Sequence, residues 1–160
     1  MEPESRQTPA LGKKLEEEHE LAEAVRRIRI VVVVGMKDRP GEPAHDIPEM
    51  LLARGLRVIP VNPKLQEALG QRAYPRIADV PESFDTVDVF RRSEFIPELA
   101  QEILALPLER RPRLVWLQSG IRSEEAAQVL VQAGIEVVQD RCLGVYASRY
   151  LPRPEISSVP

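Results

Sequence analysis

The stretch Ile30-Val-Val-Val-Val-Gly35 decides the fold class of this chain. Consecutive β-branched residues without polar alternation are typical of a strand that is covered on both faces, and a glycine ends this run. Further short apolar runs follow, with helical periodicity between them. The predicted strands span residues 30–34, 56–61, 86–90, 114–117 and 135–138. Because strands alternate with helices, we predict an α/β domain with a doubly wound, mostly parallel, five-stranded Rossmann-like sheet in a three-layer αβα arrangement.

The segments between the strands carry the helix signals. We predict helices at residues 15–27, 44–54, 93–105, 124–133 and 143–150. Ser93 and Ser123 are placed to cap the third and fourth of these helices, because a serine hydroxyl accepts a hydrogen bond from the first turn. Gly55 is placed to end the second helix. In the strands, Trp116 is predicted to be a core residue, whereas Asp88 is interpreted as an edge residue of the third strand.

Length and composition describe one soluble globular domain. The chain has 160 residues, of which 43% are hydrophobic and 29% are charged. We assign residues 13–151 to the folded domain, and we expect residues 1–12 to be disordered and residues 152–160 to form a flexible tail. The abundance of arginine and the 15 prolines are compatible with a thermophilic source, although a GC-rich genome gives the same bias.

Charge and hydropathy narrow the possible function classes. The net charge of -3 argues against a nucleic-acid partner, because nucleic-acid binders are usually basic. No apolar run approaches the ~20 residues that a membrane span needs, so no membrane partner is expected. Cys142 is the single cysteine and cannot form an internal disulfide, which favours a cytoplasmic location. The sequence indicates no particular protein partner.

Basic residues follow every predicted strand, although the chain is acidic overall. In parallel sheets the ligand crevice lies beyond the carboxyl ends of the strands, where helix N-termini also favour anions. The strand-end residues that would meet there are Gly35, Lys37, Arg39, Asn62, Lys64, Arg91, Arg92, Gln118, Ser119, Gly120, Arg122, Asp140, Arg141 and Cys142. We interpret this convergence as a site for a ligand with several phosphates. The alternative is that these cations are ordinary solvated loop residues.

Motifs at the first two strand ends narrow the choice of ligand. The loop after Gly35 does not contain G-x-G-x-x-G, and the chain has no Walker A sequence, which disfavours a nucleoside triphosphatase. An NAD site usually ends its second strand in an acid that binds the ribose, and here Asn62-Pro63-Lys64 stands in that place. A cation there suits a ribose that carries an extra phosphate, as in coenzyme A or NADP.

Several segments follow one another in an order and spacing that resembles a known family. They are Val58-Ile-Pro-Val-Asn-Pro-Lys64, Val87-Asp-Val-Phe-Arg-Arg-Ser-Glu94, Val115-Trp-Leu-Gln-Ser-Gly-Ile121 and Asp140-Arg-Cys142, with Val34-Gly35, Arg39-Pro40 and Tyr74-Pro75 in matching places. Residues 25–149 thus resemble the small bacterial CoA-binding-domain proteins. Their fold is similar to the N-terminal CoA-binding domain of the succinyl-CoA synthetase α subunit. The resemblance implies that the ligand is coenzyme A or an acyl-CoA.

The resemblance and the strand-end positions together indicate a set of cofactor-binding residues. They are Gly35, Met36, Lys37, Arg39, His45, Asn62, Pro63, Lys64, Phe90, Arg91, Arg92, Gln118, Ser119, Gly120, Ile121 and Cys142. Phe90 is a candidate for stacking on adenine or packing on pantetheine. The chain departs from the family pattern at Lys37, where relatives commonly carry a small hydroxyl residue, and at Glu42-Pro43-Ala44, where they often have Arg-Pro-Ser. Lys37 and Arg39 are the candidates to replace the phosphate donors lost there.

The catalytic signals are poor. The sequence contains no legible Ser-His-Asp or Cys-His arrangement, and two histidines with one cysteine make no metal cluster. His19 lies among glutamates and is expected to be exposed, whereas His45 either contacts a phosphate or only starts the second helix. Cys142 either faces the crevice or packs as a small apolar residue.

We therefore predict a stand-alone, non-catalytic CoA-binding protein. The alternatives are an NADP-dependent reductase, and a protein-interaction module with a vestigial crevice that docks through residues 15–27.

Overall fold

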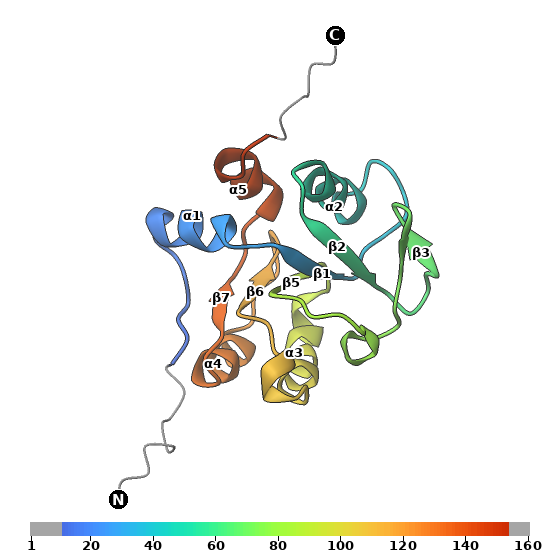
Figure 1. Cartoon of the computed structure of the whole chain (residues 1–160). Helices are drawn as coiled ribbons and strands as arrows, with labels where there is room; N and C mark the ends of the chain where they lie inside the picture. Colours follow the sequence, from blue (N-terminus) through green and yellow to red (C-terminus); the bar gives the residue numbers. More distant parts are fainter. Residues whose placement is uncertain (1–10, 154–160) are drawn as a thin grey trace, which may run out of the picture.

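The computed structural model describes residues 11–153 and contains a five-stranded sheet in which all neighbouring strands are parallel (Figure 1). The strand order is β2-β1-β5-β6-β7. The strands are β1 (Ile30–Val34), β2 (Arg57–Val61), β5 (Thr86–Val89), β6 (Leu114–Leu117) and β7 (Glu136–Val138). This order is one of the common orders of doubly wound sheets, so the predicted fold class is confirmed.

Helices cover both faces of the sheet, which explains the uninterrupted apolar run in β1. The helices α1 (Glu18–Arg26), α2 (Pro43–Ala53) and α5 (Leu143–Tyr150) lie on one face, and α3 (Ile96–Leu104) and α4 (Glu124–Gln132) lie on the other (Figure 1). Val31 and Val33 pack into the core with Trp116 on the first face, whereas Val32 and Val34 pack into the core on the second. Trp116 is fully buried, as predicted, and its Nε1 donates to the Arg141 carbonyl at 2.8 Å.

The first helix begins at Glu18 rather than at Leu15, because the preceding residues pair with the sheet. The Leu15 amide donates to the Val137 carbonyl, and the Val137 amide donates to the Lys13 carbonyl, both at 2.9 Å. The helix then starts with a capping box, in which the Glu20 side chain accepts from the backbone amide of the N-cap residue Glu17.

The helix-end predictions are confirmed at two positions and wrong at a third. Ser123 caps α4 by accepting from the Ala126 amide at 3.1 Å, and Gly55 follows α2 with a φ of +90°. Ser93 does not cap α3, because it begins the 3-10 turn η3 (Ser93–Phe95) and α3 starts only afterwards. The Ser93 hydroxyl instead accepts from the Arg122 amide at 3.0 Å.

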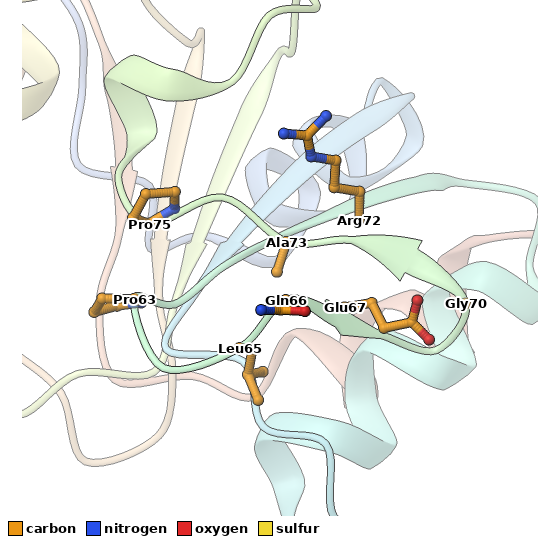
Figure 2. Close-up of a pocket in the computed structure, with 8 residues that line it drawn as sticks. All are labelled: Pro63, Leu65, Gln66, Glu67, Gly70, Arg72, Ala73 and Pro75. Atoms are coloured by element: carbon orange, nitrogen blue, oxygen red, sulfur yellow. The ribbon is translucent and has the colours of Figure 1, made fainter.

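A small hairpin between β2 and β5 was not predicted from the sequence. It consists of β3 (Glu67–Ala68) and β4 (Gln71–Arg72), which pair antiparallel around a turn where Leu69 and Gly70 both have positive φ. Elements of two residues leave no periodicity in a sequence. The hairpin borders an open groove of about 710 Å³ (Figure 2). The remaining short elements are the 3-10 turns η2 (Ile77–Asp79) and η4 (Leu108–Arg110).

The predicted disordered ends, residues 1–12 and 152–160, fall mostly outside the described residues. Of the predicted N-terminal segment, Leu11 and Gly12 are described, and the Gly12 amide donates to the Val131 carbonyl at 2.8 Å. Within residues 11–153, no helix has the length and apolar character that crossing a membrane requires.

Candidate binding site

A crevice of about 840 Å³ lies beyond the carboxyl ends of β1, β5 and β6. The chain passes from β1 to β2 on one side of β1 and then returns to β5 on its other side, so the crevice lies where the winding direction changes. Ligands of doubly wound sheets bind at this place. The crevice is lined by Lys37, Gly41, Glu42, Pro43, Ala44, Asp46, Ile47, Phe90, Arg91, Arg92, Ser93, Glu94, Gln118, Ser119, Gly120, Ile121 and Cys142.

Gly35 lies beside the crevice, at the place where the ends of β1, β2 and β5 meet. Its amide donates to the Val61 carbonyl at 2.9 Å, and the Phe90 amide donates to the Val34 carbonyl at the same distance. Gly35 has a φ of +83°, and a Cβ at this position would stand 2.5 Å from the Phe90 carbonyl oxygen. A glycine is therefore required here by both the backbone conformation and the close approach. This contact sets the place of Phe90, which lines the crevice and packs partly against the core.

Asp88 is a fully buried acid on β5, two residues before Phe90, which directly follows the strand. Its interpretation as an edge residue is wrong, because β5 is a central strand. Gln118 Nε2 donates to Asp88 Oδ1 at 2.6 Å, and Gln118 Oε1 accepts from the Leu143 amide at 3.3 Å. Asp88 Oδ2 has no hydrogen-bond partner among the described residues. Burial raises the pKa of Asp88 to about 7, because the carboxylate has lost its hydration. The crevice residue Gln118 is thus held between a buried acid and the start of α5.

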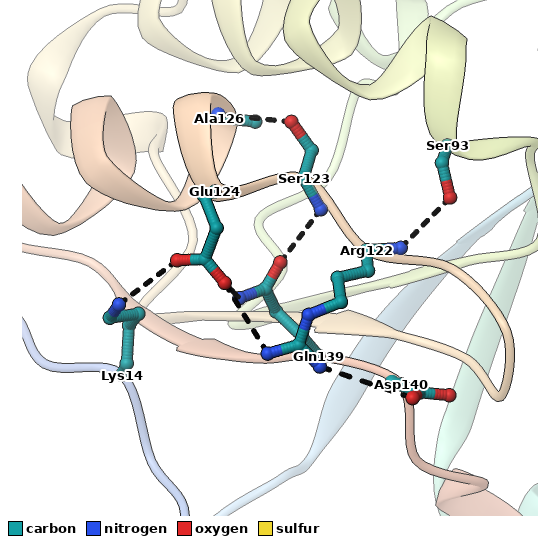
Figure 3. Close-up of polar contacts among 8 residues, drawn as sticks. All are labelled: Lys14, Ser93, Arg122, Ser123, Glu124, Ala126, Gln139 and Asp140. Atoms are coloured by element: carbon teal, nitrogen blue, oxygen red, sulfur yellow. Dashed lines mark hydrogen bonds and ion pairs between the residues drawn. The ribbon is translucent and has the colours of Figure 1, made fainter.

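The loop after β6 is held in place by residues from two other strand ends (Figure 3). The Ser123 amide donates to Gln139 Oε1 at 2.7 Å, and the Arg122 amide donates to the Ser93 hydroxyl. The Gly120 amide donates to the Asp140 carboxylate at 2.6 Å. These bonds fix the backbone of Ser119, Gly120 and Ile121 along the crevice wall, so this wall is preformed.

Acids around the crevice engage three of the seven cations that the sequence placed at the strand ends, namely Lys37, Arg39 and Arg122. Lys37 Nζ lies 3.3 Å from Glu42 Oε1, and Arg39 Nε lies 3.7 Å from Glu42 Oε2. Arg122 pairs with Glu124 at 3.3 Å and with Asp140 at 3.9 Å. Arg141 turns elsewhere, donating to the Tyr146 hydroxyl at 2.9 Å. The lining residues comprise as many carboxylates as cations, so the strand-end cations do not form one large positive field.

Arg91 and Arg92 differ from these cations. Both line the crevice, and neither forms an ion pair with an acid in the part of the chain that the structure describes. Their guanidinium groups lie over the Phe95 ring, with Arg91 Cζ 5.1 Å and Arg92 Cζ 5.8 Å from the ring centroid. Such stacking positions a guanidinium without using its hydrogen-bond donors. These two arginines are the crevice cations best placed to receive an anion.

A protein-family model described as a CoA binding domain matches residues 29–148 of the chain. The chain belongs to this CoA binding domain family. A Bacillus subtilis (strain 168) relative, the uncharacterized protein YneT, is 37% identical over 126 residues, covering 79% of this chain and 90% of YneT. A solved structure from Thermus thermophilus is 39% identical with a TM-score of 0.76, covering 84% of this chain and 99% of that chain. A hypothetical protein from Pyrococcus horikoshii OT3 is 28% identical with a TM-score of 0.78, covering 86% and 94% of the two chains.

In this CoA binding domain, the predicted cofactor-binding residues that follow β5 and β6 come together at the crevice. Several of the other predicted cofactor-binding residues lie elsewhere. Met36 is completely buried in the core, so its side chain is not part of the crevice wall, and that prediction is corrected. Asn62 links loops instead: its Nδ2 donates to the Met36 carbonyl, and its Oδ1 accepts from the Lys64 amide, both at 2.8 Å. Pro63 borders the hairpin groove of Figure 2, and the Lys64 side chain is exposed outside the crevice lining.

Most of the crevice residues that the sequence did not indicate lie at or just before the start of α2, among them Glu42, Asp46 and Ile47. Ser93 and Glu94, which follow β5, also line the crevice. The family's fold provides the missing signal, because the helix after the first strand begins beside the crevice. His45 is buried and does not line the crevice, and its Nδ1 lies 2.7 Å from Asp46 Oδ1. Glu49 lies close to both, but Asp46 Oδ1 also accepts from the Gly41 amide at 3.1 Å, so this cluster closes the start of the helix. His19 is exposed, as predicted.

Proposed function

We propose that this protein binds coenzyme A or an acyl-CoA in the crevice, as a stand-alone binding protein that does not itself catalyse a reaction. The observation that carries the proposal is that Arg91 and Arg92, which lack acid partners in the described chain, share one crevice with an apolar wall. Coenzyme A is divided in a corresponding way, into a phosphate-rich nucleotide that suits the arginines and a long pantetheine arm that suits the apolar wall. Membership of the CoA binding domain family supports the same ligand.

Each part of the crevice suits one part of this ligand. The guanidinium fork of an arginine can bind phosphate oxygens through two parallel hydrogen bonds, which an ammonium group cannot do. Ile47, Phe90 and Ile121 supply apolar surface for the pantetheine arm. The preformed loop at Gly120 lowers the ordering cost of binding, because its backbone is already fixed in the free protein.

The polar side chains of the crevice support binding without chemistry. Asp46 accepts hydrogen bonds at the start of α2, Ser93 accepts from Arg122, and both ends of the Gln118 amide are engaged. Groups held in this way stabilise the fold and leave few donors or bases for a reaction. We also propose that the protein acts in the cytoplasm, because its single cysteine is free, and that it has no nucleic-acid partner, because its net charge is -3.

Calorimetric titration is expected to show that coenzyme A binds more tightly than NAD. The crevice offers two arginines to a ligand that carries an additional phosphate, and a charge-assisted hydrogen bond contributes about 1.5–3 kcal/mol, which corresponds to a preference of roughly tenfold or more. The titration should include dephospho-CoA and NADP, because tighter binding of NADP would favour the reductase alternative.

Variants of two arginines provide the control for this titration. Arg91→Ala should weaken coenzyme A binding by roughly tenfold or more, since it removes a charge-assisted contact. Arg76→Ala removes an exposed arginine that pairs with Asp79 outside the crevice lining, and it should leave the affinity unchanged. NAD binding as tight as coenzyme A binding would contradict the proposed ligand. Absence of any small-molecule binding would favour the interaction-module alternative.

Cys142 is expected to form a mixed disulfide when the protein is incubated with CoA disulfide. The cysteine is half-buried rather than fully packed, and it lines the crevice immediately before α5. Its thiolate would attack one sulfur of CoA disulfide, form a protein–CoA disulfide and release one CoA thiolate. Intact-mass measurement should show one CoA added, reversibly by dithiothreitol. Cys142→Ser should give no adduct. A wild type that stays unmodified in the folded state but reacts when denatured would show that the thiol is inaccessible.

A further inference from the structure

Glu42 stands at the N-cap of α2 but does not use its side chain as a cap. Within the described residues, its carboxylate accepts no hydrogen bond from the first turn of the helix. The carboxylate lies instead between two cations, 3.3 Å from Lys37 Nζ and 3.7 Å from Arg39 Nε. Glu42 and Lys37 both line the crevice. An acid of the crevice wall therefore pairs with both cations that follow β1, of which Lys37 lines the crevice and Arg39 lies outside its lining.

The backbone fixes Glu42 in this position, whereas its ion pairs are weak. The Glu42 carbonyl accepts from the His45 and Asp46 amides at 2.9 and 2.8 Å, and the Lys37 amide donates to the Ala44 carbonyl at 3.1 Å. The loop is thus closed on the helix start. The side chains of Lys37 and Arg39 are 58% and 80% exposed, and ion pairs at such exposure are weak and easily exchanged. A phosphate can replace the carboxylate as their partner, since phosphate accepts stronger charge-assisted bonds.

We infer that Glu42 is a specificity-determining residue that competes with a ligand phosphate for Lys37 and Arg39. This inference rests on the proposed binding of a phosphate-bearing ligand in the same crevice. In the free protein, the carboxylate holds the two cations. A ligand must displace it and then tolerate its negative charge nearby, because the helix start keeps Glu42 at the crevice. Glu42 therefore lowers the binding affinity of every anionic ligand. The loss of affinity is greatest for ligands whose phosphates form weaker contacts with the two cations.

The test compares Glu42→Gln with Glu49→Gln, a matched substitution of an exposed acid on the same helix. Glu42→Gln keeps the shape of the side chain and removes its charge. We expect it to raise coenzyme A affinity about tenfold, as one charge contact in a partly solvated site allows. Glu49→Gln should change the affinity less than about twofold, since it lies outside the crevice lining. Equal gains for the two variants, or no gain for Glu42→Gln, would overturn the inference.

A double-mutant cycle separates competition for the cations from general repulsion. Lys37→Ala should weaken coenzyme A binding only slightly in the wild type, where Glu42 holds Lys37, and several times more in the Glu42→Gln background. Additive effects of the two substitutions would overturn the competition.

Inorganic pyrophosphate provides a second probe that does not depend on the coenzyme. Its binding, followed by chemical-shift changes at Lys37 and Arg39, should also tighten in Glu42→Gln. If coenzyme A binds to neither protein while pyrophosphate binds more tightly to the variant, the proposed function fails and the role of Glu42 stands. If coenzyme A binds to both proteins equally, the proposed function stands and the role of Glu42 fails.

Discussion

The free energy of unfolding of the Asp88→Asn variant is expected to rise relative to that of the wild type as the pH increases from 5 to 8. Burial raises the pKa of Asp88 from 3.8 to about 7 in the folded state. Between these two values the folded chain holds a proton that the unfolded chain releases. The contribution of protonated Asp88 to stability is therefore complete below pH 3.8 and is progressively lost as the pH rises to about 7.

The size of this effect follows from the number of pH units that separate pH 5 from the pKa of Asp88 in the folded state, about 7. Each pH unit between the two pKa values corresponds to about 1.4 kcal/mol, so the wild type should lose about 2–3 kcal/mol relative to Asp88→Asn between pH 5 and pH 8. The asparagine has its own cost, because its amide would also be buried beside Gln118, but that cost does not vary with pH. The difference between the two pH values therefore isolates the titration of Asp88.

Urea unfolding of both proteins at pH 5 and pH 8 measures this difference, with Glu49→Gln as a control for the loss of an exposed carboxylate. Glu49→Gln should follow the wild type at both pH values. The expectation fails if Asp88→Asn and the wild type change in parallel. Such a result would mean that Asp88 is ionised in the folded protein throughout this range.

Gly35→Ala is expected to destabilise the fold by about 2–5 kcal/mol and to disturb the crevice as well. The left-handed conformation of residue 35 costs an alanine about 1–2 kcal/mol, and forcing a methyl group into packed surroundings typically costs another 1–3 kcal/mol. The added Cβ would meet the Phe90 carbonyl oxygen at 2.5 Å and Arg91 Cγ at 3.4 Å. Because both residues line the crevice, the affinity for coenzyme A should fall together with stability.

Gly55→Ala is the matched control for this substitution. Gly55 has a similar φ of +90°, but a Cβ there would meet no atom within 4 Å. Its substitution should therefore cost only the conformational term of about 1–2 kcal/mol and leave ligand binding unchanged. Chemical denaturation and calorimetric titration of both variants measure the two effects. Equal losses of stability for Gly35→Ala and Gly55→Ala would show that the contact with Phe90 is not important.

Local sequence was enough to predict the strands, the main helices and the loops that carry the site. The valines of β1 are β-branched and follow one another without polar alternation, so they predict a strand that is covered on both faces, as in the centre of a parallel sheet. Ser123 predicts a helix start because its hydroxyl acts within one turn of chain. The strand ends predict where Phe90, Arg91 and Gln118 meet, since parallel strands present their carboxyl ends at one edge.

Only the tertiary structure decided which of these residues are free to bind. Loop sequences have no periodicity, so the position of a cation in a loop does not indicate which acid it will pair with. Glu42 pairs with Lys37 within one loop, whereas Arg91 has no acid partner in the described chain and lies over the Phe95 ring. The same holds for Asp88: a short polar residue in β5 reads as an edge position until its neighbouring strands and helices are known. The sequence by itself determined the sheet and the edge where the site lies, because both follow from local pattern. The charges available at that edge depend on contacts between loops distant in the chain, which form only when the domain folds.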